Sequence, residues 1–141
     1  MAVLKYARGA TLETLLNTGA TLANNALAVS SAITITDTGY LEADLELVVT
    51  FSVAPTASTG ISVWFLREVD GTNYEDGGAS VTPTRAPDCV IPVAALTTAQ
   101  RVNAVAMLPP GPFKVLAKND GTGQTMSTGW TLKVKPYSYQ I

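Results

Sequence analysis

Alternation of apolar and polar residues is the main pattern in the middle of the chain. In an extended conformation, residues 41–53 would place apolar side chains on one face: Leu41, Ala43, Leu45, Leu47, Val49, Phe51 and Val53. Charged or small polar residues occupy most of the positions between them. A period of two is typical of a strand with one buried face. We therefore predict a long strand here, antiparallel in character.

The next predicted strand covers residues 61–69, after a turn marked by Pro55 and Gly60. One of its faces carries Ile61, Val63, Phe65 and Val69. Trp64 and Leu66 lie on the opposite face, so both faces are apolar. We expect this strand to be covered twice, by the core on one side and by a neighbouring molecule or a loop on the other.

Three more strands are predicted towards the C-terminus, over residues 101–108, 113–118 and 130–137. The last two are expected to form a hairpin around a turn region at residues 119–129. Lysines alternate with apolar residues in both, as is typical of an exposed sheet face or edge. The proline-rich stretch before them is expected to be extended loop with short edge strands, and residues 97–100 are expected to form one helical turn.

The N-terminal region is less clearly patterned. Helical and extended spacing fit it equally well, and Leu12, Leu15 and Leu16 would form one face of a short helix. A strand is expected to begin near Ile33. Residues 1–11 are interpreted as an arm. Because a free terminus is usually disordered unless it is tied down, we expect an ordered arm to lie on a partner.

Counting these elements gives seven or eight strands and almost no helix. This pattern predicts an all-β fold, an antiparallel β-sandwich of jelly-roll-like type with an extended N-terminal arm. With 141 residues and no linker or internal repeat, residues 1–141 are expected to form a single domain.

Charged residues are scarce. They make up 14% of the chain, against about 25% in a typical soluble protein. The surface must therefore be solvated by Ser, Thr, Asn and Gly or hidden in contacts. The nine basic residues are scattered, which argues against nucleic-acid binding. Two uncharged stretches, residues 14–36 and 47–66, are interrupted by polar residues, so no membrane span is predicted. The N-terminus lacks the apolar core of an export signal.

Candidate chemistry is sparse. The chain has no histidine, which removes Ser-His-Asp and Cys-His catalysis and most zinc sites. Asp70, Glu75 and Asp76 lie in a glycine-rich loop, where carboxylates are solvated and not tuned for catalysis. Their spacing does not match an EF-hand. Cys89 is the single cysteine and is interpreted as a small buried apolar residue. We predict no enzyme, no catalytic residue, no metal and no cofactor.

A resemblance is carried by the order of several turn and strand segments. The segments are Leu66 to Gly77, Pro83, Ala99 to Arg101, Leu108 to Lys114, Lys118-Asn119, Thr122 to Gln124 and Trp130 to Tyr137. In this order, over roughly residues 40 to 140, the chain resembles small virion structural proteins of tailed bacteriophages. The resemblance implies a β-sandwich component of the particle, either a capsid decoration (cement) protein or a tail or collar component. Cement proteins of this kind commonly sit as trimers between capsomers.

The expected function is therefore structural. A cement protein would be made in the host cytoplasm and located in the virion. Its expected partners are copies of itself, with a trimer favoured, and the major capsid protein or other virion proteins. The proposed interface residues lie in the arm and in two loops: Leu4, Tyr6, Leu12, Asp70, Asn73, Tyr74, Pro83, Arg85 and Pro87. The alternative is a carbohydrate- or receptor-binding module with an exposed aromatic platform drawn from Trp64, Trp130, Tyr74, Tyr137 and Tyr139. The exposure of Trp64 and Tyr74 would distinguish this alternative.

Overall fold

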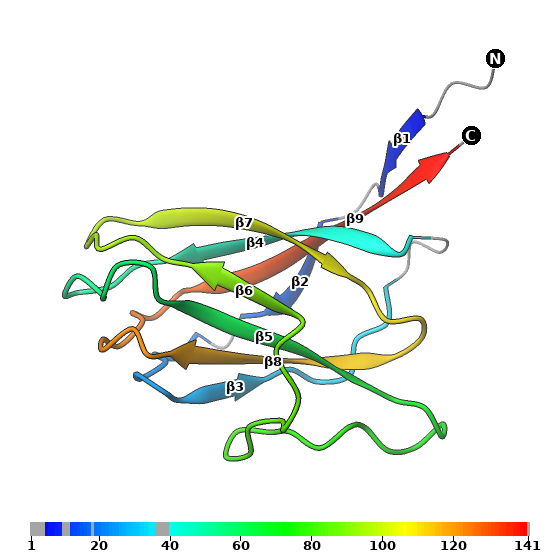
Figure 1. Ribbon diagram of the computed structural model, residues 1–141, viewed down its shortest axis with the longest axis horizontal. Coiled ribbons are helices and arrows are strands. Elements are labelled where there is room, and N and C mark those ends of the chain that lie inside the picture. Colours follow the sequence, from blue (N-terminus) through cyan, green and yellow to red (C-terminus); the bar gives the residue numbers. More distant parts are fainter. Residues whose placement is uncertain (1–4, 10–11, 18, 36–39, 141) are drawn as a thin grey trace.

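The computed structural model describes residues 5–9, 12–17, 19–35 and 40–140 (Figure 1). The described residues form strands and connecting loops and no α-helix. The strands are β1 (Lys5–Arg8), β2 (Glu13–Leu16), β3 (Leu27–Val29), β4 (Glu42–Val49), β5 (Gly60–Arg67), β6 (Cys89–Pro92), β7 (Gln100–Met107), β8 (Phe113–Asp120) and β9 (Thr131–Gln140).

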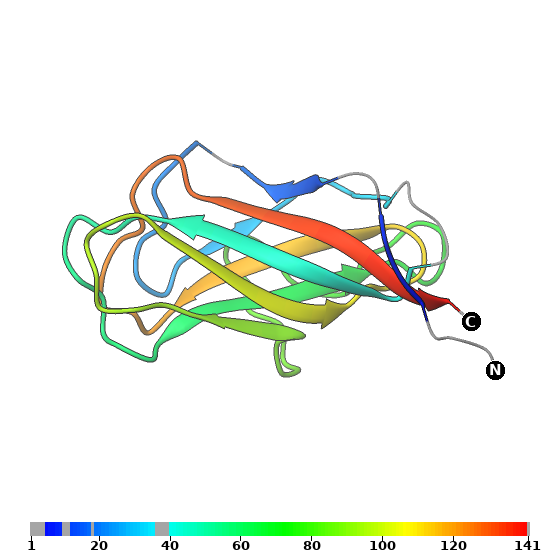
Figure 2. The same ribbon diagram turned by 90° about the horizontal axis from the view of Figure 1, so that it is seen from above.

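Two antiparallel sheets pack face to face. One has the order β1-β9-β4-β7, with β2 also pairing with β9, and the other has the order β3-β8-β5-β6. The pairs β2–β9, β3–β8, β4–β7 and β5–β6 are nested, as if one long hairpin were wound across both sheets. Figure 2 shows the two layers from above. This nesting is the jelly-roll topology, so the predicted fold class is confirmed.

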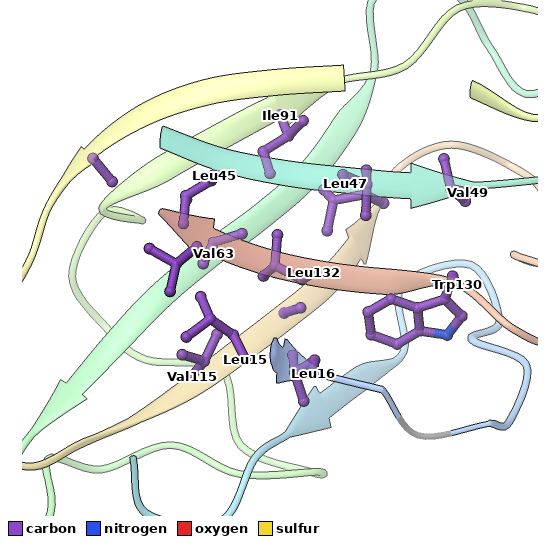
Figure 3. Packing of buried hydrophobic residues seen from close by; sticks show 14 of the residues in the cluster. Leu15, Leu16, Leu45, Leu47, Val49, Val63, Ile91, Val115, Trp130 and Leu132 are labelled. Carbon is purple, nitrogen blue, oxygen red and sulfur yellow. The ribbon is translucent and has the colours of Figure 1, made fainter. Parts of the chain in front are cut away.

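The core lies between the sheets and is built from the alternating positions of the long strands. Leu45 and Leu47 of β4 face Val63 of β5 across it, and the Trp130 ring closes one end (Figure 3). The rings of Phe65 and Phe113 meet edge to face, with centroids 5.4 Å apart. All of these side chains are buried, which confirms the inward faces predicted for these strands.

The predicted strands at residues 41–53 and 61–69 are longer than the observed β4 and β5. Leu41, Val53 and Val69 were placed on buried faces, but all three are exposed. The regular pairing of β4 with β7 ends at Val49, opposite Gln100, and β5 ends at Arg67, opposite Phe113. The alternation of apolar and polar residues continues in the sequence beyond the paired ends of β4 and β5, where no opposing sheet covers the side chains.

The predicted hairpin between β8 and β9 is wrong. β8 pairs with β3 and β5 in one sheet, and β9 pairs with β1, β2 and β4 in the other. Their connection therefore crosses from one layer to the other. Sheets packed face to face lie about 10 Å apart, and the connection over residues 121–130 is long enough to cross that gap.

Leu15 and Leu16 lie in strand β2, so the short helix considered for this segment does not form. The register of β2 against β9 shifts between Thr14 and Leu16, as in a β-bulge. The extra residue lets Leu15 and Leu16 both be buried, which strict alternation forbids. Leu12, just before β2, is exposed.

The N-terminal arm is seen in part. Its described segment, β1, pairs with the end of β9 in the same chain, where Lys5 lies opposite Gln140. Figure 1 shows this two-strand ribbon extending beyond the body of the sandwich. Order in this segment therefore has a cause within the chain and does not require a partner. Leu4 and the side chain of Tyr6 lie outside the described residues.

The helical turn predicted at residues 97–100 is also absent, because the Gln100 side chain holds the loop in a different shape. Its Oε1 accepts from the Ala94 N–H at 2.8 Å, and its Nε2 donates to the carbonyl oxygens of Ala94 and Leu96 at 2.9 and 3.2 Å. At the same end, buried Asn119 donates to the carbonyl oxygens of Leu22 and Gln124. The loops at this end are thus fixed by polar side chains, while the longest loop lies at the other end.

Candidate functional site

The connection between β5 and β6, residues 68–88, folds back over the outer face of its own sheet. Figure 1 shows it passing below β5 and β8. Beneath it lies a second apolar cluster of Trp64, Leu66 and Leu116, separate from the main core. Trp64 is only 3% exposed. The prediction that this strand is covered twice is therefore confirmed, and the outer cover is a loop of the same chain.

Close contacts hold the loop on this cluster. The Trp64 Nε1–H donates to the carbonyl oxygen of Arg85 at 3.1 Å. Gly77 approaches so closely that a Cβ there would lie 2.9 Å from the Leu66 Cδ2 atom and 3.3 Å from the Pro83 Cγ atom. A larger residue at position 77 would require the Leu66 side chain or the loop to shift. Pro83 is buried in this packing.

Arg85 ties the loop together electrostatically. Its Nε lies 2.5 Å from Glu75 Oε1, and its Nη2 lies 2.9 Å from Asp88 Oδ2. Nη2 also donates to the carbonyl oxygen of Phe65 in β5, at 3.0 Å. The hydrogen bond from Arg85 lowers the pKa of Glu75, and the carboxylates, Glu75 first, raise the pKa of Arg85. A planar guanidinium with several donors suits such a junction.

Asp70 folds the tip of the loop. One of its carboxylate oxygens accepts from the backbone N–H groups of Asn73 and Thr72, at 2.6 and 2.8 Å, and the other accepts from Asn73 Nδ2 at 2.8 Å. These hydrogen bonds, from Asn73 first, lower the pKa of Asp70 from 3.8 to about 2. Gly71 between them has a φ of 81°, a conformation that favours glycine.

The folded loop forms an open groove with a volume of about 530 Å³. Its lining residues are Arg67, Val69, Asp70, Asn73, Tyr74, Glu75 and Arg85. Lys114 Nζ sits 4.5 Å from the centre of the Tyr74 ring, a cation–π distance. Partial burial and the charge of Glu68 raise the pKa of Tyr74.

Four of the predicted interface residues therefore meet at this groove: Asp70, Asn73, Tyr74 and Arg85. Pro83, Pro87 and Leu12 do not line it. Pro83 is buried within the loop, Pro87 is half-buried near the end of the loop, and Leu12 lies just before β2 of the other sheet.

Arg67, Val69 and Lys114 are part of the site and were not predicted. Arg67 ends β5, and Val69 is 92% exposed at the rim of the groove. An apolar residue directly before the turn sequence Asp70-Gly71 was the available signal for Val69. Lys114 comes from β8, and only the pairing of β8 with β5 brings it to Tyr74.

The groove offers shape and apolar contact in place of reactive groups. Its carboxylates are already engaged by Arg85 or by backbone N–H groups. Among the described residues, no three His, Cys, Asp or Glu side chains gather to hold a metal ion. Half-buried Cys89 has a pKa raised by that burial and by the charge of Asp88, which reduces its nucleophilic thiolate fraction.

Comparison with known proteins adds no relative. No protein-family model matches the chain, and no curated protein matches it. None of the described residues forms a helix that could cross a membrane.

Proposed function

We propose that this protein is a non-enzymatic structural component of a tailed-phage virion, most specifically a capsid decoration or cement protein. One observation carries the proposal. A folded β-sandwich with few charges leaves large apolar side chains exposed in several places: Leu12, Leu41, Val53, Val69, Val81, Val90, Leu96, Val105 and Met107. Because charged residues make up only 14% of the chain, against about 25% in a typical soluble protein, this surface suits contact with protein neighbours.

The proposed mechanism is added buried area. Each subunit would bridge neighbouring capsid subunits and raise the free energy needed to separate them against the internal DNA pressure. Stable interfaces bury about 1,200–2,000 Å² in total, and repeated contacts across a shell add through multivalency. The groove of the β5–β6 loop is the proposed contact with the major capsid protein. Copies of the chain are also proposed to associate, and the resemblance favours a trimer.

The groove supports this assignment through its composition. Tyr and Arg are enriched at the centres of protein interfaces, and here Tyr74 and two arginines line a hollow beside exposed Val69. The Arg85 contacts fix the loop before any partner arrives. A preorganised loop loses less conformational entropy on binding than a mobile one.

The test is binding of the purified chain to phage heads that lack their decoration protein, measured by co-sedimentation. We expect saturable binding and a higher temperature of DNA release. Val69→Asp should weaken binding by about tenfold or more, since a charge at an interface centre must be desolvated. Val53→Asp, at an exposed position in the loop between β4 and β5 that does not line the groove, is the matched control. Failure to bind heads would overturn the cement assignment, and binding to tails would move the protein there.

The sugar- or receptor-binding alternative has less support. Trp64 is buried beneath the loop and offers no exposed ring, and Lys114 lies over the Tyr74 ring. Stacking of a sugar needs a free aromatic face. Specific binding on a glycan array, lost in Tyr74→Ala, would reverse this ranking.

A further inference from the structure

The side of the molecule formed by β6, β7 and the loop between them, residues 89–107, is nearly without charge. We call it the β6–β7 flank. It contains one charged residue, Arg101. It also carries four large exposed apolar side chains: Val90, Leu96, Val105 and Met107. Val105 and Met107 are 60% and 69% exposed. Val105 and Met107, the two most exposed of the four, lie at alternate positions on the outward face of β7.

Both strands of the flank are edge strands of their sheets. β6 is the last strand of one sheet and β7 the last strand of the other, and Figure 2 shows them on the same side of the molecule. An edge strand presents backbone N–H and C=O groups with which another strand can pair. Among the described residues, β7 pairs only with β4. Its second edge is therefore available along the strand.

The other edge strands have features that oppose pairing with a further strand, and β7 does not. β1 contains Lys5 and Arg8, β2 has a register shift, β3 is three residues long and β6 ends in Pro92. Charges, irregularities, short length and proline are the usual protections of an edge strand. β7 is eight residues long, pairs with β4 without a register shift and has its single charge near its start.

We propose that the β6–β7 flank binds a second copy of this chain, with β7 pairing antiparallel to β7 of that copy across a two-fold axis at Ala104. This register places Arg101 of each copy opposite Met107 of the other, and Asn103 opposite Val105. Residues that face outward stay on one side of the joined sheet. No like charges meet across the strands, which would be destabilising. Self-complementary contact of this type is what a two-fold axis requires.

Charge complementarity supports a second copy as the occupant. Met107 pairs with Glu42 of β4 in the same chain. Arg101 of the second copy would therefore lie two strand spacings, about 9.5 Å, from Glu42, within the combined reach of the two side chains. Arg101 contacts Glu46 of its own chain at 2.8 Å, so the dimer would extend this charge row at both ends of the junction.

This contact is separate from the cement assignment and from the three-fold association that the resemblance implies. It concerns copies of the chain in solution and needs no shell. If heads failed to bind the protein, the proposed function would be overturned and the β7 contact would remain. If the protein bound heads but stayed monomeric in solution, the β7 contact would be overturned and the proposed function would remain.

The first test is sedimentation velocity of the full chain over a range of concentrations, without heads. Wild type is expected to show a concentration-dependent monomer–dimer equilibrium. Val105→Lys should raise the dissociation constant by about tenfold or more, because a charge on the edge strand opposes pairing. Val53→Lys, an equally exposed valine off the flank, should leave it unchanged. A monomer at all concentrations, or an oligomer insensitive to Val105→Lys, would overturn the proposal.

The second test addresses the register, in a Cys89→Ser background. Directly opposed residues on antiparallel strands have Cα atoms about 4.5–5.5 Å apart, within the range of about 4.4–6.8 Å that a disulfide spans. Ala104→Cys should therefore form a disulfide-linked dimer under mild oxidation. Asn103→Cys, one residue away and not opposite itself, should not. Equal cross-linking of both, or of neither, would overturn the proposed β7 register.

Discussion

The outer faces of the two sheets are covered in different ways. On the β9-β4-β7 sheet, Glu42, Asp44 and Glu46 of β4 alternate outward beside Lys133 and Lys135 of β9. Charges of opposite sign sit in neighbouring positions across this face. On the β3-β8-β5-β6 sheet, the outward residues of β5 and β8 include Trp64, Leu66 and Leu116, and the β5–β6 loop covers them.

This difference has a functional consequence. A charged outer face needs no covering segment, because its side chains are solvated by water. Exposed ion pairs of this kind contribute about 0–1 kcal/mol each to stability. An apolar outer face requires a cover, and covering it fixes the covering loop in one conformation. The ordered groove over residues 67–85 is thus a by-product of the apolar face of β5. We therefore look for recognition on this sheet and along the unpaired edge of β7, and not on the charged rows of β4 and β9.

The largest expected difference between the two outer faces comes from removing the tryptophan under the loop. Trp64→Ala should lower the free energy of unfolding by about 3–5 kcal/mol, because it leaves a large cavity in the second cluster. Denaturant unfolding measures this loss. Lys133→Ala on the charged face should change the free energy by no more than about 0.5 kcal/mol. Similar costs for the two variants would show that the loop does not pack tightly on the sheet.

The second prediction concerns the ion pairs that fix the loop. Arg85→Ala leaves two partly buried carboxylates, Glu75 and Asp88, without their cation. We expect a loss of about 1–3 kcal/mol in unfolding free energy and faster proteolysis within residues 68–88. Arg101→Ala removes an exposed ion pair from the charged face and should cost less than about 0.5 kcal/mol. If proteolysis of the loop were unchanged in Arg85→Ala, the proposed role of this junction would be wrong.

The smallest expected effect is the pH dependence of the loop tip. The pKa of Asp70 is lowered from 3.8 to about 2 in the folded chain. A carboxyl group with a lowered folded pKa stabilises the fold above its unfolded pKa, and this stabilisation is lost as the pH falls through the folded value. Wild type should therefore lose part of its stability between about pH 4 and pH 2.

Asp70→Asn should show a shallower decline in thermal unfolding temperature over this acidic interval, because position 70 no longer titrates. Asp76→Asn, a change at another exposed carboxylate of the same loop, serves as the control for the loss of one negative charge. An identical pH profile for wild type and Asp70→Asn would contradict a contribution from the turn at Asp70.

Much of the fold was predictable because burial on one face leaves a period of two in the sequence. The inward faces of β4, β5 and β9 follow from that period alone. The loop was also recognisable from its turn residues, and four of its predicted residues do line the groove. Arg85 was placed at an interface from its position in the loop, but its contacts with Glu75 and Asp88 depend on how the loop folds back.

Other features depended on contacts between segments distant in the sequence. The bulge that buries both Leu15 and Leu16 is set by the register of β2 against β9. The loop shape near residues 94–100 is set by where the Gln100 side chain finds partners. Neither leaves a periodic signal, since each arises from the geometry of one particular pairing.

The sequence by itself determined that the chain forms half-buried strands with few surface charges, because alternation and composition are properties of single segments. Only the tertiary structure decided which strands pair. It placed β8 and β9 in different sheets although they are neighbours in sequence. It also left β7 as a long edge strand with few features that oppose pairing. The physical reason is that strand pairing uses backbone groups that every residue carries, so the choice of partner is made by the packing of both sheets around one core.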